Sequence, residues 1–394
     1  MLIKYAFTLC VCLISLVINA QNSDVVRVLE EVEQNNNELI AFASMMEGKQ
    51  LELKSSNNLT NPQVDAYYLP YGNHSSGDYT EFQIAQSFEF PSVYAARKNL
   101  INQQIMDLEL IFVSKKQEVL LTTKKYCLEL IILNKTMKIE QARVEQAREV
   151  FDHVKTLFEK DQVGILSFNK AKIVWMQEQF SSQKIALQQL SLLAELQNLN
   201  GGNEVVIPSF ELVDNYSLLP VDSLWNEKLS SDPYLISLQQ KEAIALQEIK
   251  LSKNKSLPDL ALGYSQQGYS GEYYSGFYGG ISIPIFGNKN KVKAAEANFQ
   301  FQQSYSNVLS IEAKAAFEKQ YNKYVLLLEN FEEYSQSMSG LNSSALLLKA
   351  YELGEISFME YYVELQFYQQ ATNAMLYMEK QLNLLKAELL KHQL

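Results

Sequence analysis

The sequence predicts a mainly α-helical fold with a smaller β component, in which long helices pack as antiparallel coiled coils beside two β-hairpins. Three observations predict this fold. Segments of the first half recur in the second half at nearly one offset, each half contains two strand-like segments, and one very long stretch lacks glycine and proline. We therefore expect an internally duplicated chain.

Three pairs of segments carry the duplication. NPQVDAYYLPYG at 61–72 corresponds to LPDLALGYSQQG at 257–268, FQIAQSFEFP at 82–91 to FYGGISIPIF at 277–286, and GILSF at 164–168 to GEISF at 354–358. The offsets are 196 residues (62 to 258), 195 (82 to 277) and 190 (164 to 354). A period this long indicates a duplicated half-protein rather than a solenoid repeat. We expect a first structural repeat at 21–202, a linker at 203–221 and a second repeat at 222–394.

Residues 1–20 predict a secretory signal peptide. Lys4 ends a short basic region, an apolar run extends from Tyr5 to Val17, and Ala20 precedes a polar residue. This apolar run is too short for a membrane span. Cys10 and Cys12 would leave with the signal peptide, so the remaining cysteine, at 127, has no partner for an intrachain disulfide.

Composition and motifs exclude several classes of function. The net charge of −11 disfavours nucleic acid as a partner. The sequence contains no Gly-x-Ser-x-Gly elbow, phosphate-binding loop or His-Glu-x-x-His pair, so we expect no enzyme and no cofactor. The histidines at 74, 153 and 392 are scattered, and the pair Met45-Met46 is typical of helix packing more than of soft-metal binding, so we expect no metal site.

In the first half, we expect a helix at 24–56, strands at 63–71 and 82–90, and helices at 92–160 and 168–199. No glycine or proline lies between Pro91 and Gly164, which predicts a single helix roughly 100 Å long at 1.5 Å per residue. Its apolar residues recur at three and four positions, as in a coiled-coil seam. These residues are Leu128, Ile131, Ile132, Ile139 and Ala142.

The second half predicts the same order of elements. We expect helices at 222–255, 290–351 and 358–391 and strands at 259–266 and 277–286. Two short helices placed end to end match one long helix in length. The simplest packing is therefore four rods of roughly 100 Å, with both hairpins at one end and both glycine turns at the other.

The strand-like segments alternate in polarity. Residues 82–90 carry apolar side chains on one face and polar or small ones on the other, and 281–285 continues this pattern. Strands of about 9–11 residues cross an outer membrane, with lipid-facing and lumen-facing positions in alternation. The predicted lipid-facing residues are Phe82, Ile84, Phe88, Phe90, Ile281, Ile283 and Ile285; Asp65 and Glu89 are predicted to face a lumen. Aromatic residues at strand ends resemble the girdles of such barrels, namely Tyr67, Tyr68, Tyr71, Tyr79, Phe277 and Tyr278.

Four strands cannot close a barrel, and open sheet edges do not occur in lipid. Several chains would therefore have to pool their hairpins. Three chains supply twelve strands and two chains supply eight, and a barrel of eight strands would be filled by side chains.

The signal peptide, the duplicated helix–hairpin–helix halves and the repeated Gly-x-x-Ser-Phe turn together resemble the TolC family of outer-membrane efflux proteins. The stretch QSFEFPSVY at 86–94 is most similar to the heavy-metal, CzcC/CusC-like branch. The resemblance implies a homotrimer with a twelve-stranded transmembrane β-barrel in outer-membrane lipid, continued by a periplasmic α-barrel. It further implies the exit duct of a tripartite efflux pump for small molecules or metal ions, with a periplasmic adaptor (membrane fusion) protein and an inner-membrane transporter of the RND type.

The resemblance also implies a periplasmic tip or gate at the two turns, formed by Gly164, Tyr351, Gly354 and Glu360. Glu360 matches an acid of the constriction, and Tyr351 matches a gating tyrosine. Two positions depart from the family: Ile356 replaces an arginine, and Lys170 stands where the first turn would have its acid. In the simpler interpretation, Glu360 is a solvated acid at a helix start and both glycines only form turns.

A second hypothesis is a periplasmic or secreted coiled-coil scaffold without a membrane barrel. The hairpins distinguish the two hypotheses, because a scaffold does not need two pairs of strand-length segments with an apolar face.

Overall fold

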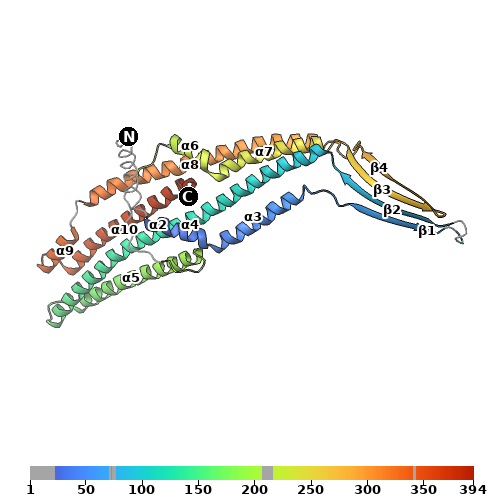
Figure 1. Ribbon diagram of the computed structural model, residues 1–394. Helices are drawn as coiled ribbons and strands as arrows, with labels where there is room; N and C mark the ends of the chain where they lie inside the picture. Colours follow the sequence, from blue (N-terminus) through green and yellow to red (C-terminus); the bar gives the residue numbers. More distant parts are fainter. Residues whose placement is uncertain (1–22, 71, 73–76, 206–215, 340–342) are drawn as a thin grey trace, which may run out of the picture. The chain divides into compact units, whose positions relative to one another are not determined.

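The computed structural model describes residues 23–70, 72, 77–205, 216–339 and 343–394 (Figure 1). The predicted signal peptide, Tyr71, His74 and the middle of the predicted linker lie outside these residues. The described chain divides into two compact units. Unit 1 contains the described residues up to Ile40 with Lys115–Lys228 and Ala315–Leu394, and unit 2 contains Ala41–Ser114 and Leu229–Lys314.

The elements of the first half are α2 (Ser23–Asn35), α3 (Asn37–Ser55), β1 (Gln63–Leu69), β2 (Tyr79–Phe88), α4 (Pro91–Glu159) and α5 (Ile165–Leu199). Those of the second half are α6 (Val221–Ser231), α7 (Pro233–Asn254), β3 (Asp259–Tyr269), β4 (Glu272–Ser282), α8 (Lys291–Ser339), α9 (Ser343–Glu352), α10 (Phe358–Leu389) and the 3₁₀ turn η1 (Lys391–Gln393). Within the described ranges, every helix is too short or too polar to span a lipid bilayer.

The long helix expected at 92–160 is confirmed, because α4 runs for 69 residues. Pro91 occupies its first position, where a missing N–H costs nothing. Other expected helices are interrupted by short polar residues that cap helix ends. At the α6–α7 junction, the Asp232 side chain accepts the N–H of Tyr234 at 2.9 Å. Asn36 separates α2 from α3, and its side-chain oxygen accepts the N–H of Leu39 at 2.9 Å.

Unit 1 has an apolar core contributed by several of its helices. The core cluster contains Val28, Val32, Leu39, Val119, Cys127, Leu130, Leu196 and Val205. Burial raises the pKa of the Cys127 thiol to about 12, so this side chain stays a neutral, inert thiol.

Ion pairs join α4 and α10 within unit 1. Lys380 contacts Glu129 at 2.9 Å, and Lys135 contacts the buried Glu379 at 2.8 Å. Further along α4, Arg143 donates to Asn373 of α10 at 3.1 Å. Residue numbers rise along α4 while they fall along α10, so the two helices are antiparallel, as the sequence predicted.

Unit 2 contains a four-stranded antiparallel sheet in the order β1-β2-β3-β4 (Figure 1). Ser270 and Gly271 join β3 to β4, and both have positive φ angles, which is the geometry of a tight type I′ hairpin turn. β3 and β4 therefore extend further toward this turn than the sequence predicted. β4 ends at Ser282 instead of reaching 286, because Pro284 has no N–H for a ladder.

The predicted packing of four rods and the division into two repeats concern both units together, and both stay predictions. Each compact unit draws segments from both halves of the chain.

Candidate functional site

The register of the sheet separates its side chains into an apolar and a polar face, because directly paired residues project to the same side. Phe88, Leu260 and Ile281 lie opposite one another across three strands. Four further residues, Val64, Ile84, Tyr264 and Phe277, form a row across all four strands. The apolar side chains on this face include Val64, Ala66, Phe82, Ile84, Phe88, Leu260, Leu262, Tyr264, Phe277 and Ile281. Four polar side chains, Thr80, Gln86, Gln266 and Ser275, lie on the same side. Much of it is exposed, and Phe277 is 90% accessible.

All four charged residues of the strands lie on the polar face, and all are acidic: Asp65, Glu81, Asp259 and Glu272. Glu81 accepts hydrogen bonds from the Tyr79 hydroxyl at 2.7 Å and from the Gln267 amide at 3.2 Å. The polar face therefore has its own hydrogen-bonded network, as expected for a surface in contact with water.

Gly263 allows a tyrosine to cover the polar face. It pairs directly with Tyr278, and a Cβ at Gly263 would lie 2.4 Å from that ring. The Tyr278 hydroxyl then accepts a hydrogen bond from the amide of Gln83, two strands away. The glycine thus adds to sheet cohesion instead of weakening it.

Both edges of the sheet are open within the described residues. β1 pairs only with β2, and β4 pairs only with β3. Each outer edge presents unpaired backbone N–H and C=O groups, which can template pairing with another chain.

Four of the predicted lipid-facing residues, Phe82, Ile84, Phe88 and Ile281, lie on the apolar face. The other three, Phe90, Ile283 and Ile285, are exposed but follow the strand ends at Phe88 and Ser282. The predicted girdle divides between the faces, because Tyr68 and Phe277 share the apolar face, whereas Tyr67, Tyr79 and Tyr278 share the polar face.

The two residues predicted to face a lumen differ in position. Asp65 lies on the polar face. Glu89 follows β2 and accepts a hydrogen bond from Arg97 at 2.7 Å. Its charge is therefore paired with that of Arg97, which lies near the start of α4.

The two turns of unit 1 share a hydrophobic core, here called the turn cluster: Val150, Val154, Ala171, Tyr351, Phe358 and Tyr361. The Tyr351 ring stacks on the Tyr361 ring at 5.3 Å and meets the His153 ring edge-on at 5.7 Å. Burial raises the pKa of the Tyr351 phenol. Both turns predicted to form the tip are thus joined by one packed core.

Gly354 and Gly164 have different conformations. Gly354 has a φ of +73° in the turn after α9, a left-handed conformation that favours glycine. Gly164 has a φ of −80° and is the N-cap of α5, a conformation open to any residue. The left-handed residue of the first turn is Asp161, with a φ of +57°.

Glu360 forms a capping box with Ser357 at the start of α10. Its carboxylate accepts the Ser357 N–H at 2.8 Å, and the Ser357 hydroxyl accepts the Glu360 N–H at 3.3 Å. The backbone and then the side chain of Ser357 lower the pKa of Glu360. Ile356 packs against the turn cluster, and Lys170 is exposed on α5.

No family model matches this sequence, and no curated protein matches it. Several solved structures do match. CusC, studied for its folding and transmembrane channel formation, gives a TM-score of 0.78 at 14% identity over 94% of this chain and 92% of CusC. The outer membrane protein VceC from Vibrio cholerae gives 0.71 at 14% identity over 94% of each chain. The Campylobacter jejuni CmeC outer membrane channel gives 0.70 at 15% identity over 94% and 85%.

This chain has the fold of CusC, VceC and CmeC. Identities this low show the fold alone. The fold that the resemblance implied is therefore confirmed. The trimer, the duplication and the roles of individual residues stay predictions.

Within this fold, the sequence analysis missed a partly buried polar network beside the turn cluster. Arg143 donates to Glu140 at 2.9 Å and to the carbonyl oxygen of Gln369 at 3.4 Å, and the Gln369 side chain donates to Glu178 at 3.2 Å. Burial, and then the neighbouring Glu140 carboxyl, raise the pKa of Glu178. The residues of this network lie on three helices, so no local pattern in the sequence could have identified them.

Proposed function

We propose that this chain is one protomer of an outer-membrane channel that serves as the exit duct of a tripartite efflux pump. Small molecules or metal ions would pass through it passively across the periplasm and outer membrane. The observation that carries the proposal is the sheet, which has an apolar face, an acidic polar face and two open edges. The shared fold with outer-membrane channels supports it.

The sheet requires partners if it lies in lipid, since an unpaired edge there would cost several kcal/mol for each unsatisfied group. Copies of the same chain meet this requirement when β1 of one protomer pairs with β4 of the next. Three protomers give a twelve-stranded barrel, wide enough for a lumen, with the apolar face toward lipid and the acidic face toward water.

A stripe on α5 supports the assembly independently. Apolar side chains recur there every seven residues and are all exposed: Leu166, Ile173, Phe180 and Leu187. A seven-residue apolar repeat is the pattern of a coiled-coil seam. Because the stripe is uncovered in the single chain, we propose that a helix of a neighbouring protomer packs on it in the homotrimer.

The turn cluster is the proposed periplasmic tip. We propose that a periplasmic adaptor protein docks there and links the channel to an inner-membrane transporter of the RND type. Gly164, Tyr351, Gly354 and Glu360 are the proposed tip residues. Replacing Glu360→Gln is expected to alter the block of the reconstituted channel by cations, and an unchanged block would remove Glu360 from the gate.

The test compares neighbouring residues on opposite faces of β2. Ile84→Lys places a charge on the apolar face and should destabilise a membrane barrel by about 2–4 kcal/mol near its midplane. Gln83→Lys places the same charge on the polar face, and should leave assembly intact while shifting the current toward anions.

Native mass spectrometry of detergent-extracted protein and single-channel recording provide the two readouts. A trimer for wild type and Gln83→Lys, with loss of trimer for Ile84→Lys, is the expected result. A soluble monomer or dimer without pore current would overturn the proposal and favour the coiled-coil scaffold.

A further inference from the structure

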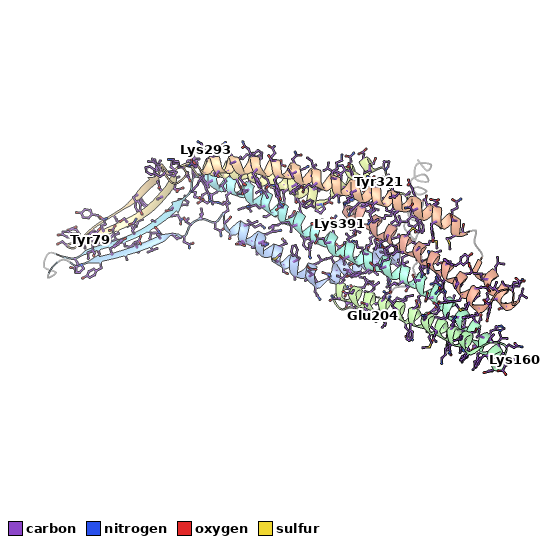
Figure 2. All side chains as sticks on the ribbon, turned by 180° about the vertical axis from the view of Figure 1, so that it is seen from behind. Tyr79, Lys160, Glu204, Lys293, Tyr321 and Lys391 are labelled. Atoms are coloured by element: carbon purple, nitrogen blue, oxygen red, sulfur yellow. The ribbon has the colours of Figure 1, made fainter. Side chains whose placement is uncertain are left out.

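Basic residues are excluded from the strands and gather where the second hairpin joins its helices. No lysine or arginine lies between 63 and 88 or between 259 and 288. The end of α7, the start of α8 and the residues next to these helix ends carry the lysine patch, defined as Lys250, Lys253, Lys255, Lys289, Lys291 and Lys293. Figure 2 labels Lys293 at the start of α8, where the ribbon leads into the sheet.

Contacts between the two helix ends bring the segments that carry these lysines close together in unit 2. The side-chain amide of Asn288 donates to the carbonyl oxygen of Lys255. Deeper along the helices, Lys253 contacts Glu296 at 3.5 Å. Turns hold the rest of the segment, with the N–H of Lys291 bonded to the Asn288 carbonyl at 3.2 Å.

The charge of the patch is largely uncompensated. All six lysines are exposed, and among the described residues only Lys253 has an acid within ion-pair distance. Lys291 and Lys293 also occupy the first turn of α8, which contains no acidic residue. Cations are disfavoured at this end of a helix because the macrodipole is positive there. An anion placed against the patch would reduce the repulsion among the lysines and the repulsion between the lysines and the positive end of the α8 macrodipole.

An apolar segment lies directly beside the patch. Ile283, Ile285 and Phe286 connect β4 to the lysines, and all are exposed, Phe286 at 87%. They extend the apolar surface past Ile281, the last apolar residue of β4. Along the chain, an apolar strand is followed by an apolar turn and then by a cationic helix start. A lipid leaflet has the matching order of acyl chains, acyl boundary and headgroups.

We propose that the lysine patch binds the phosphate groups of anionic phospholipids in the leaflet that faces the helices, with Ile283, Ile285 and Phe286 at the acyl boundary. This inference rests on the proposed function, because the sheet must lie in a membrane for the patch to reach headgroups. Ammonium groups near an anionic leaflet are attracted to it, and the attraction weakens with added salt.

The experiment measures lipid preference at the protein surface. The full chain is reconstituted in phosphatidylcholine vesicles that contain a trace of spin-labelled phosphatidylglycerol or spin-labelled phosphatidylcholine. Electron spin resonance then gives the relative association of the two labels with the protein. Wild type should prefer the anionic label, and the variant K255Q/K289Q/K291Q/K293Q should lose at least roughly fivefold of that preference, the factor that corresponds to about 1 kcal/mol.

Two variants control for charge and position. K255R/K289R/K291R/K293R keeps the charge and should keep the preference. K155Q/K160Q/K172Q/K184Q removes four exposed lysines of unit 1, outside the patch, and should also keep it. A comparable loss in either variant would overturn the inference.

Insertion is scored separately by the pore current across the same vesicles. If wild type inserts and conducts but shows no anionic preference, or if the glutamine variant keeps the preference, the inference fails and the proposed function stands. If wild type neither inserts nor conducts, the proposed function fails and the inference with it.

Discussion

The turn after α4 and the turn after α9 have the same backbone structure but different sequences. Asp161 donates its N–H to the Phe158 carbonyl at 3.0 Å, and Gly354 donates to the Tyr351 carbonyl at the same distance. In each turn, the residue with positive φ is followed three positions later by the N-cap of the next helix, Gly164 or Ser357. The two turns are therefore related by 193 residues (161 to 354), not by the 190 of the Gly-x-x-Ser-Phe pattern.

This offset changes which residues are equivalent. Glu360 corresponds to Ser167, not to Lys170, so treating Lys170 as the counterpart of the acid was wrong. The aromatic pairs agree with the new offset, because Phe158 stacks on Phe168 at 5.0 Å and Tyr351 stacks on Tyr361 at 5.3 Å. The two turns thus share their backbone geometry, while the Gly-x-x-Ser-Phe pattern is displaced by three residues between them. Backbone hydrogen bonds and ring packing therefore define this turn.

The largest expected difference between the turns lies in their aromatic pairs. Tyr361 is only 2% exposed, and its hydroxyl accepts a hydrogen bond from Gln146 at 2.9 Å, whereas Phe168 is half-buried. Tyr361→Ala should lower the free energy of opening of α10 by about 3–5 kcal/mol. Phe168→Ala should have a smaller effect on α5. Amide hydrogen exchange along both helices measures the two values, and equal losses would contradict the difference in burial.

Substitutions at the two residues with positive φ should have opposite effects on stability. Gly354→Ala places a Cβ at a φ of +73° and should destabilise the second turn by about 1–2 kcal/mol. Asp161→Gly removes a Cβ from the same conformation and should stabilise the first turn, by up to about 1 kcal/mol. Hydrogen exchange of the residues after α9 and after α4 measures the two changes in stability. Opposite signs support the offset of 193, while a destabilised Asp161→Gly turn would argue against it.

The N-caps differ by a side-chain hydrogen bond. Ser357 caps α10 through its hydroxyl, whereas Gly164 has no side chain to cap α5. Ser357→Ala should cost about 1 kcal/mol, and Gly164→Ser should gain a few tenths of a kcal/mol. The exchange rates of the first amides of α10 and α5 give the comparison. Faster exchange in Gly164→Ser would show that the first turn cannot accept the cap.

The sequence was sufficient for elements whose cause is local. The absence of glycine and proline after Pro91 predicted α4 to within a residue at each end, and alternating polarity predicted the apolar side of β2. The pattern failed where a single side chain redirects the backbone. Asn36 and Asp232 end helices because their side chains cap the next one, an outcome that periodicity does not reveal.

Other parts depended on distant partners. Glycine is disfavoured inside a strand, yet at Gly263 the Tyr278 ring from across the ladder fills the space that a side chain would occupy. The network of Arg143, Glu178 and Gln369 joins residues up to 226 positions apart. The two turns were aligned by similar residue types, whereas the equivalent residues Gly354 and Asp161 share their backbone geometry and not their side chains.

The smallest expected effect concerns pH and distinguishes Glu360 from Ser167, its counterpart. Hydrogen bonds from Ser357 lower the pKa of Glu360 below its ordinary 4.5 in the folded chain. A lowered pKa means that the folded state favours the charged form. The stabilisation is therefore present above pH 4.5 and is lost as the pH falls through the folded pKa. The first turn has no carboxyl group at the matching position, so its stability should not follow this titration.

Hydrogen exchange of the first turn of α10, corrected for the intrinsic pH dependence of exchange, measures the effect from neutral pH downward. Wild type should open more easily below pH 4.5, while Glu360→Gln should keep a capping side chain but lose the dependence. The first turn of α5 is the internal control. If Glu360→Gln follows the same pH profile as wild type, another group controls the α10 turn, and the capping box is not the feature that separates the two turns in acid.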